Sequence, residues 1–158
     1  MTNKELNQLI GERSRAMMTI ILTRRTDLTI RDTKQGTGLD HHIYIEREDK
    51  PMRLAFGLLL RGVASATTIA KANTILRPTM GQFQGMRKFT YPVCLFFFTM
   101  ADDKGYFSWL AEPILGEGGP KLLHREKADC VDLTNEKLEE VVERVVAWYD
   151  EVELLLMA

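Results

Sequence analysis

Two charged residues at the ends of neighbouring predicted strands have the types and spacing of a binding or catalytic site. Asp40 opens the segment HHIYIERE, and Arg61 closes the apolar segment MRLAFGLLLRG that follows it. Side chains two positions apart on a strand point the same way, so Leu59 is expected to face with Arg61. A carboxylate can hold a divalent cation, and an arginine can bind a phosphate through two hydrogen bonds. A structural alternative is that Asp40 is a strand-start residue ion-paired with Arg61.

A second acid, Glu12, lies on a helix predicted over residues 3 to about 25. Asn3 can cap the N terminus of this helix. Apolar side chains recur along it at three- and four-residue spacings, at Leu6, Leu9, Ile10, Met17, Ile20 and Ile21. Glu12 falls at the edge of this stripe, so it can point to solvent or along the edge of a packed sheet.

The first of the two strands alternates between its two faces. Residues 40, 42, 44 and 46 share one face, and residues 41, 43 and 45 share the other. The adjacent residues His41 and His42 therefore point to opposite sides and cannot grip one ion together. Glu46 shares the face of Asp40, but about 20 Å of extended strand separates the two. His42 shares the face of Asp40 at a distance of about 7 Å, so a metal site that contains His42 stays open as an alternative.

The rest of the chain predicts strands alternating with helices. A glycine-rich turn at 34–38 and a break at Asp49-Lys50-Pro51 bound the first strand. The other predicted elements are an extended segment at 27–32, helical segments at 65–76 and 79–89, a strand at 92–100 that a turn at 101–105 joins to a strand at 106–110, a loop at 112–128, an edge strand at 130–133 and a final helix at about 134–156. We expect one α/β domain over residues 1–158, with a mixed central sheet of about four to five strands flanked by helices.

Composition and charge exclude some classes of protein. The formal net charge of -1 argues against a polycation that binds nucleic acid by charge alone. Charge is uneven, because residues 1–99 carry 15 Lys and Arg against 8 Asp and Glu, whereas residues 100–158 carry 6 against 14. No apolar run reaches the roughly 20 residues of a membrane helix. Two cysteines without a C-x-x-C spacing and a polar start, MTNKELNQ, predict a cytoplasmic protein without a membrane anchor.

Basic side chains gather in the first 34 residues. Apart from Lys4, they are Arg13, Arg15, Arg24, Arg25, Arg31 and Lys34. Clustered cations are what sequence-independent nucleic-acid binding mainly requires. We take Arg24, Arg25 and Lys34 as the candidate nucleic-acid contacts, and a solvated surface is the alternative.

The final helix carries an apolar stripe at heptad spacing. Its members are Leu138, Val141, Val145, Trp148, Val152 and Leu155. Such a stripe commonly covers a sheet, and joining two copies of the chain in a homodimer is the alternative.

The order of these motifs resembles the PD-(D/E)XK nuclease-like superfamily. More narrowly, the sequence is similar to an uncharacterised bacterial domain family of that superfamily, whose members carry a G-E on the first helix, a G-x-D, a strand ending Q-V-K-(S/G) and a late P-V-x-L-V hairpin. The resemblance covers about residues 5 to 115. The matching segments are Gly11-Glu12, Gly38-Leu39-Asp40, Phe56 to Gly62, Tyr91 to Leu95 and Tyr106 to Pro113.

The resemblance implies a role for each matched residue. In active members, the Asp and a Glu or Gln two residues before a Lys hold magnesium, the helix Glu often completes the metal shell, and the Lys orients or deprotonates the attacking water. Asp40 and Glu12 match the two acids, and Arg61 stands where the Lys is expected. Leu59 stands at the second ligand position, and a hydrocarbon cannot coordinate magnesium. Arginine stays protonated, so it is a poor base, although it can clamp a phosphate.

The resemblance therefore implies a nuclease-like fold with a degenerate site. We expect a domain that has lost efficient catalysis and binds nucleic acid or a partner protein, in a setting such as bacterial defence. No cofactor is expected for that role, and magnesium is expected if the site is active. Two alternatives stay open: an active magnesium-dependent DNA or RNA endonuclease, and a structural subunit of an oligomer joined by the C-terminal helix.

Overall fold

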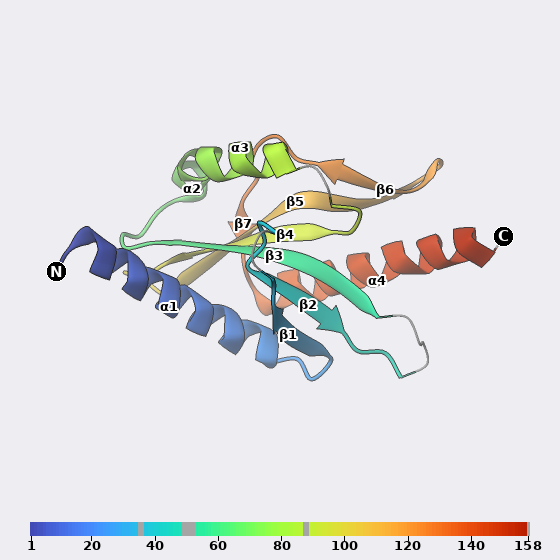
Figure 1. Ribbon diagram of the computed structural model, residues 1–158, viewed down its shortest axis with the longest axis horizontal. Coiled ribbons are helices and arrows are strands. Elements are labelled where there is room, and N and C mark those ends of the chain that lie inside the picture. The colour runs from blue at the N-terminus through green and yellow to red at the C-terminus, as the bar shows by residue number, and fades with distance from the viewer. Residues whose placement is uncertain (35–36, 49–52, 87–88, 158) are drawn as a thin grey trace.

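The computed structural model describes residues 1–34, 37–48, 53–86 and 89–157, and Figure 1 shows how its elements are arranged. The helices are α1 (Asn3–Thr23), α2 (Ile69–Ile75), α3 (Arg77–Met86) and α4 (Asn135–Met157). The strands are β1 (Leu28–Asp32), β2 (His41–Ile45), β3 (Leu54–Val63), β4 (Val93–Thr99), β5 (Lys104–Gly116), β6 (Gly119–His124) and β7 (Val131–Asp132). The break predicted at Asp49-Lys50-Pro51 and residues 35 and 36 of the predicted turn lie outside the described residues.

A mixed seven-stranded sheet forms the centre of the molecule. Six strands lie in the order β1-β2-β3-β4-β5-β6, and β7 pairs with part of β5. The strands β3 and β4 are parallel, and the other described pairs are antiparallel. The connection between the parallel strands contains α2 and α3, because parallel neighbours need a long crossover. The predicted α/β class with a mixed sheet is confirmed.

Helices cover both faces of this sheet (Figure 1). On one face, α1 and α4 bury side chains in a core with Ile43, Phe56 and Phe96. On the other face, α2 and α3 form a second core over Leu59 and Phe97. Burial on both faces explains why β4 is apolar along its whole length.

The helix α1 begins at Asn3, but Thr2 and not Asn3 is its cap. The Thr2 hydroxyl accepts a hydrogen bond from Glu5 N at 3.1 Å, and the Glu5 carboxylate accepts one from Thr2 N at 3.2 Å. This reciprocal capping box satisfies two backbone donors at the helix start. Except for the half-buried Ile10, residues 3–13 are exposed, and this end of α1 extends beyond the sheet in Figure 1.

The predicted alternation of the first strand is confirmed in β2. Residues 41, 43 and 45 are buried, and residues 42 and 44 are half-buried. Antiparallel pairing places His41 opposite Leu58 of β3. Because β3 continues to Val63, it runs past the end of β2 on the side where Asp40 lies.

The loop predicted at 112–128 is wrong over much of its length. Residues 112–116 extend β5, and β6 pairs with them as an antiparallel hairpin. The sheet therefore has seven strands where about four to five are expected. Pro113 lies beyond Ala111, the last β5 residue that pairs with β4, and Pro120 lies on the edge strand β6. A residue without an N–H is tolerated at such positions. The prolines and glycines therefore predict a loop where the chain forms a hairpin.

The apolar stripe of α4 serves mainly as a core face. Leu138, Val141, Val145 and Trp148 are buried against the sheet. Thr134 caps the helix, because its hydroxyl accepts a hydrogen bond from Lys137 N at 3.0 Å. Residues 154–157 at the far end stay exposed. None of the described helices has the length and apolar character needed to cross a membrane.

A buried acid, Glu112, joins β5 to the segment after β6 and to α4. Its carboxylate accepts hydrogen bonds from Arg125 Nε at 2.8 Å and from Arg144 Nη2 at 3.0 Å. Burial alone would raise the pKa of this carboxyl, but the bonds from the two arginines outweigh burial and lower the pKa of Glu112. The charged form of Glu112 therefore stabilises the fold.

We expect Glu112→Gln to destabilise the protein by about 2 kcal/mol at neutral pH, since it removes hydrogen bonds to a charged group. Because the folded pKa is lowered, this stabilisation is present above the ordinary glutamate pKa of about 4.3 and is lost as the pH falls through the folded value. Urea unfolding of the two proteins should differ at neutral pH, and the difference should shrink in acid as the pH falls below the ordinary glutamate pKa of about 4.3. Glu117→Gln, at an exposed hairpin position, is the matched control. An equal loss at both pH values would contradict the role of charge.

Candidate functional site

A cleft of about 450 Å³ lies between α1 and the end of β3. We call it the α1–β3 cleft. The residues that line it include Gln8, Glu12, Ser14, Arg15, Asp40, His41, Arg61 and Gly62. The structure thus brings Glu12, Asp40 and Arg61, which are far apart in the sequence, to one cleft.

Asp40 directly precedes β2 and hydrogen-bonds to the part of β3 that extends beyond β2. Its N–H donates to Leu58 O at 3.0 Å, and its Oδ2 accepts a hydrogen bond from Leu60 N at 2.7 Å. Arg61 Nη1 lies 3.3 Å from the same Oδ2. The ion pair of the structural alternative is therefore present. Because both side chains are more than one-third exposed, this pair contributes only about 0–1 kcal/mol.

A close approach of α1 to β3 shapes the other wall. A Cβ atom at Gly62 would lie 2.4 Å from Ser14 Oγ, so a larger residue would push the helix away. With the helix held there, Gln8, Glu12 and Arg15 line the cleft, because residues three and four apart share one helix face. Gln8 Nε2 lies 3.5 Å from Glu12 Oε1.

Two buried polar side chains lie in the wall of the cleft. Ser14 is 1% exposed, and its hydroxyl has no hydrogen-bond partner among the described residues. His41 is also buried, and its Nδ1 lies 3.1 Å from Asp32 Oδ1, although without the alignment of a hydrogen bond. A buried polar group without a partner costs about 1–3 kcal/mol. The Ser14 hydroxyl is enclosed where α1 approaches Gly62, so it presents no surface to the cleft.

The side chains of the cleft provide too few oxygen ligands to hold a metal ion without further ligands from outside the protein. Magnesium requires hard oxygen ligands in near-octahedral geometry. Glu12 and Asp40 are the two carboxylates among the described residues of the cleft wall, and the described part of the chain has no metal-binding group of three His, Cys, Asp or Glu side chains. Leu59, at the expected second-ligand position, is 1% exposed in the core under α2 and α3. It supplies no oxygen and does not line the cleft.

Two of the cations predicted to contact nucleic acid lie away from this cleft. Arg24 donates to Asn135 Oδ1 at 2.9 Å. Arg25 makes two hydrogen bonds of 2.9 Å to Asp27, and these bonds raise the pKa of Arg25. Both lie at the C-terminal end of α1, about 18 Å along the helix from Glu12.

Two other cations lie at or near the cleft. Lys34 is exposed and follows β1 at the end of the sheet where Thr33 N donates to Asp40 O at 3.4 Å. Arg15 lines the cleft itself. The sequence contains one indication that Arg15 belongs to the site: it follows Glu12 by three positions and so lies on the same helix face.

His42 and the cysteines play no part in the cleft. His42 Nε2 lies 2.8 Å from Tyr91 Oη, and burial lowers the pKa of His42. Burial also raises the pKa of the Cys94 thiol far above its usual range. The pKa of Cys130 rises to about 11, first through burial and then through Asp129. Neutral thiols of this kind are poor nucleophiles.

The residues of the α1–β3 cleft suit the binding of a phosphate group. Arg15 and Arg61 supply cationic N–H donors, and Arg61 stands where the resemblance expects the lysine that activates water. The chain matches no family model, no curated protein and no solved structure. A functional proposal therefore depends on the chemistry of this cleft and on the sequence resemblance.

Proposed function

We propose that the α1–β3 cleft binds the phosphate backbone of a nucleic acid without hydrolysing it efficiently. The observation that carries the proposal is the presence of Arg15 and Arg61 in one cleft. Arginine presents parallel N–H donors that match two phosphate oxygens.

Arg61 retains donors for a ligand despite its contact with Asp40. Its bonds to Asp40 Oδ2 and to Leu60 O, at 3.3 and 2.8 Å, both come from Nη1. A guanidinium group has five N–H donors. The donors on Nη2 and Nε can therefore engage a phosphate while Nη1 keeps its present partners.

The charge balance predicts modest and salt-sensitive affinity. Arg15, Arg61 and Lys34 provide three positive charges at this end of the sheet, and Glu12 and Asp40 provide two negative ones. The two acids repel phosphate and weaken binding. We therefore expect a dissociation constant of about 10–100 μM at physiological salt, within the range of non-specific nucleic-acid binding.

Efficient hydrolysis is not expected from these residues. Arg61 replaces the lysine that the resemblance expects, and a guanidinium group is a poor base for an attacking water. Leu59 contributes no ligand from its buried position. The cleft therefore has arginine side chains that can bind a phosphate, but it lacks the lysine that would activate the attacking water.

The variant Asp40→Ala separates binding from catalysis. Removing the carboxylate reduces repulsion and frees Arg61, so nucleic acid should bind equally well or up to about fivefold more tightly. Anisotropy of labelled single- and double-stranded oligonucleotides measures affinity, and gel analysis in magnesium measures cleavage. Asp40→Asn is the matched control, because its amide oxygen can still accept from Leu60 N. Magnesium-dependent cleavage by the wild type that Asp40→Ala abolishes would contradict the proposal and indicate an active nuclease.

A further inference from the structure

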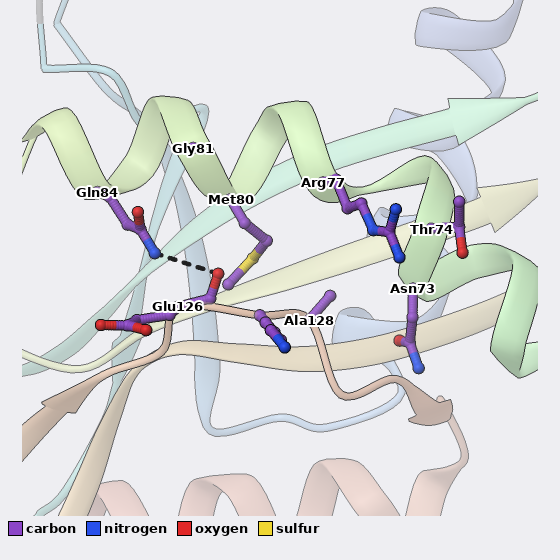
Figure 2. A pocket seen from close by; sticks show the side chains of 9 residues that line it. Asn73, Thr74, Arg77, Met80, Gly81, Gln84, Glu126 and Ala128 are labelled. Atoms are coloured by element: carbon purple, nitrogen blue, oxygen red, sulfur yellow. Dashed lines mark hydrogen bonds between the residues drawn. The ribbon is translucent and has the colours of Figure 1, made fainter.

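A second cleft, of about 470 Å³, lies on the face of the sheet opposite α1. It is bounded by α2 and α3 on one side and by the segment Glu126–Ala128, which follows β6, on the other (Figure 2). We call it the α2–α3 cleft. It shares no lining residue with the α1–β3 cleft, so the two can be tested independently.

Hydrogen bonds hold the two walls of the α2–α3 cleft in place. Gln84 Nε2 of α3 donates to Glu126 O at 3.1 Å, as the dashed line in Figure 2 marks. At the other end, Cys130 N donates to Asn73 Oδ1 of α2 at 2.8 Å. The segment between these bonds is therefore tied to both helices. The cleft is formed before any ligand binds, which is typical of small-molecule sites.

A glycine in the middle of α3, Gly81, lines the cleft and is exposed. A Cβ atom added at Gly81 would meet no atom within 4 Å. Glycine inside a helix is less favourable than alanine by about 1 kcal/mol, so packing does not explain its presence here. Beside it, Met80 is buried, and its side chain runs from α3 toward the segment 126–128 on the side of Glu126 (Figure 2). The exposed backbone at Gly81 thus offers a small surface without a side chain.

The polar groups around this surface suit an anion with a hydrogen-bonding ring. Arg77 and Lys127 line the cleft, and neither makes an ion pair with another described residue; Glu126 is the one acid among the described lining residues. The partners of the two amides fix their orientations. Asn73 accepts through its oxygen and so keeps its NH₂ donors, whereas Gln84 donates through its nitrogen and keeps an oxygen acceptor.

We propose that the α2–α3 cleft binds a nucleoside monophosphate. The phosphate would pair with Arg77 and Lys127, since these cations have no competing partner within the described chain. The base would lie against the exposed backbone at Gly81. The amides of Asn73 and Gln84 offer one donor and one acceptor to the edge of the base. The volume of the cleft lies within the range of small-ligand pockets.

Calorimetric titration of the full chain with AMP, CMP, GMP and UMP tests this inference. At least one nucleotide should bind with a dissociation constant of about 1 mM or tighter. Inorganic phosphate should bind at least about tenfold more weakly, because it lacks the base. Arg77→Gln should weaken nucleotide binding about tenfold or more, through loss of a charge-assisted hydrogen bond.

A matched pair of glycine variants locates the site. Gly81→Leu fills the cleft and should abolish nucleotide binding. Gly85→Leu places the same side chain on the same helix, also in open space but outside the cleft lining, and should bind like the wild type. The inference is overturned if no nucleotide binds with a dissociation constant of about 1 mM or tighter, if inorganic phosphate binds as tightly as the nucleotides, or if Gly81→Leu binds normally. If Gly81→Leu does not fold, Arg77→Gln provides the test. Unchanged nucleotide affinity in Arg77→Gln also overturns the inference.

Discussion

Replacing both Arg15 and Arg61 by alanine is expected to weaken nucleic-acid binding about 200-fold at 50 mM salt. Each lost phosphate contact reduces the slope of log affinity against log salt concentration by about 0.9, which corresponds to about 15-fold in affinity at 50 mM. At 150 mM salt the same variant should lose about 30-fold, and its slope should be smaller by about 2. Fluorescence anisotropy of a labelled oligonucleotide at several salt concentrations measures both quantities.

The matched control removes two positive charges from the far end of α1. Arg24 and Arg25 already have protein partners in Asn135 and Asp27. They also lie more than a Debye length of about 10 Å from the cleft at moderate salt. Arg24→Ala with Arg25→Ala should therefore change affinity by less than about threefold. An equal loss in both double variants would mean that only the overall charge matters, and the cleft would lose its special role.

Val145→Glu is expected to unfold the protein. Val145 is fully buried in the core between α4 and the sheet. A glutamate there would lose the packing of the valine and bury a carboxylate without a partner, for a total of more than about 4 kcal/mol. This is a large part of the about 5–15 kcal/mol that stabilises a typical domain. Thermal or urea unfolding followed by circular dichroism measures the loss.

Leu155→Glu on the same stripe serves as the control for this prediction. Leu155 is 61% exposed near the end of α4, so its replacement should change stability by less than about 0.5 kcal/mol. A helix-mediated dimer predicts a different result, because Val145→Glu would then give a folded monomer. Sedimentation of the variants distinguishes a folded monomer from an unfolded chain.

Much of the fold follows from local sequence patterns. Alternation in β2 identifies its buried face, and continuous apolar sequence identifies β4 as a strand buried on both sides. The hairpin of β6 could not be found in this way. Its edge position tolerates Pro120, and β4 no longer pairs with β5 at Pro113. Residues that normally interrupt strands are compatible with a strand where no backbone partner needs their N–H.

Part of the candidate site can be predicted from the sequence. The resemblance and the spacing single out Glu12, Asp40 and Arg61, which line one cleft. Charge clustering alone favours Arg24 and Arg25 as nucleic-acid contacts. Their distance from the cleft could not be predicted, because the sequence does not say which end of the helix lies at the edge of the sheet. The buried hydroxyl of Ser14 was equally hidden, since its environment depends on the close approach at Gly62.

The most direct test is the affinity of the wild-type chain for labelled oligonucleotides in EDTA over about 50–200 mM salt, followed by gel analysis after magnesium is added. We predict saturable binding that weakens with salt, with a slope of about 2–3 for contacts from Arg15, Arg61 and Lys34. The oligonucleotide should stay intact in magnesium. Absence of binding at about 100 μM protein in the lowest salt, or rapid magnesium-dependent cleavage, would contradict a phosphate-binding site without efficient catalysis.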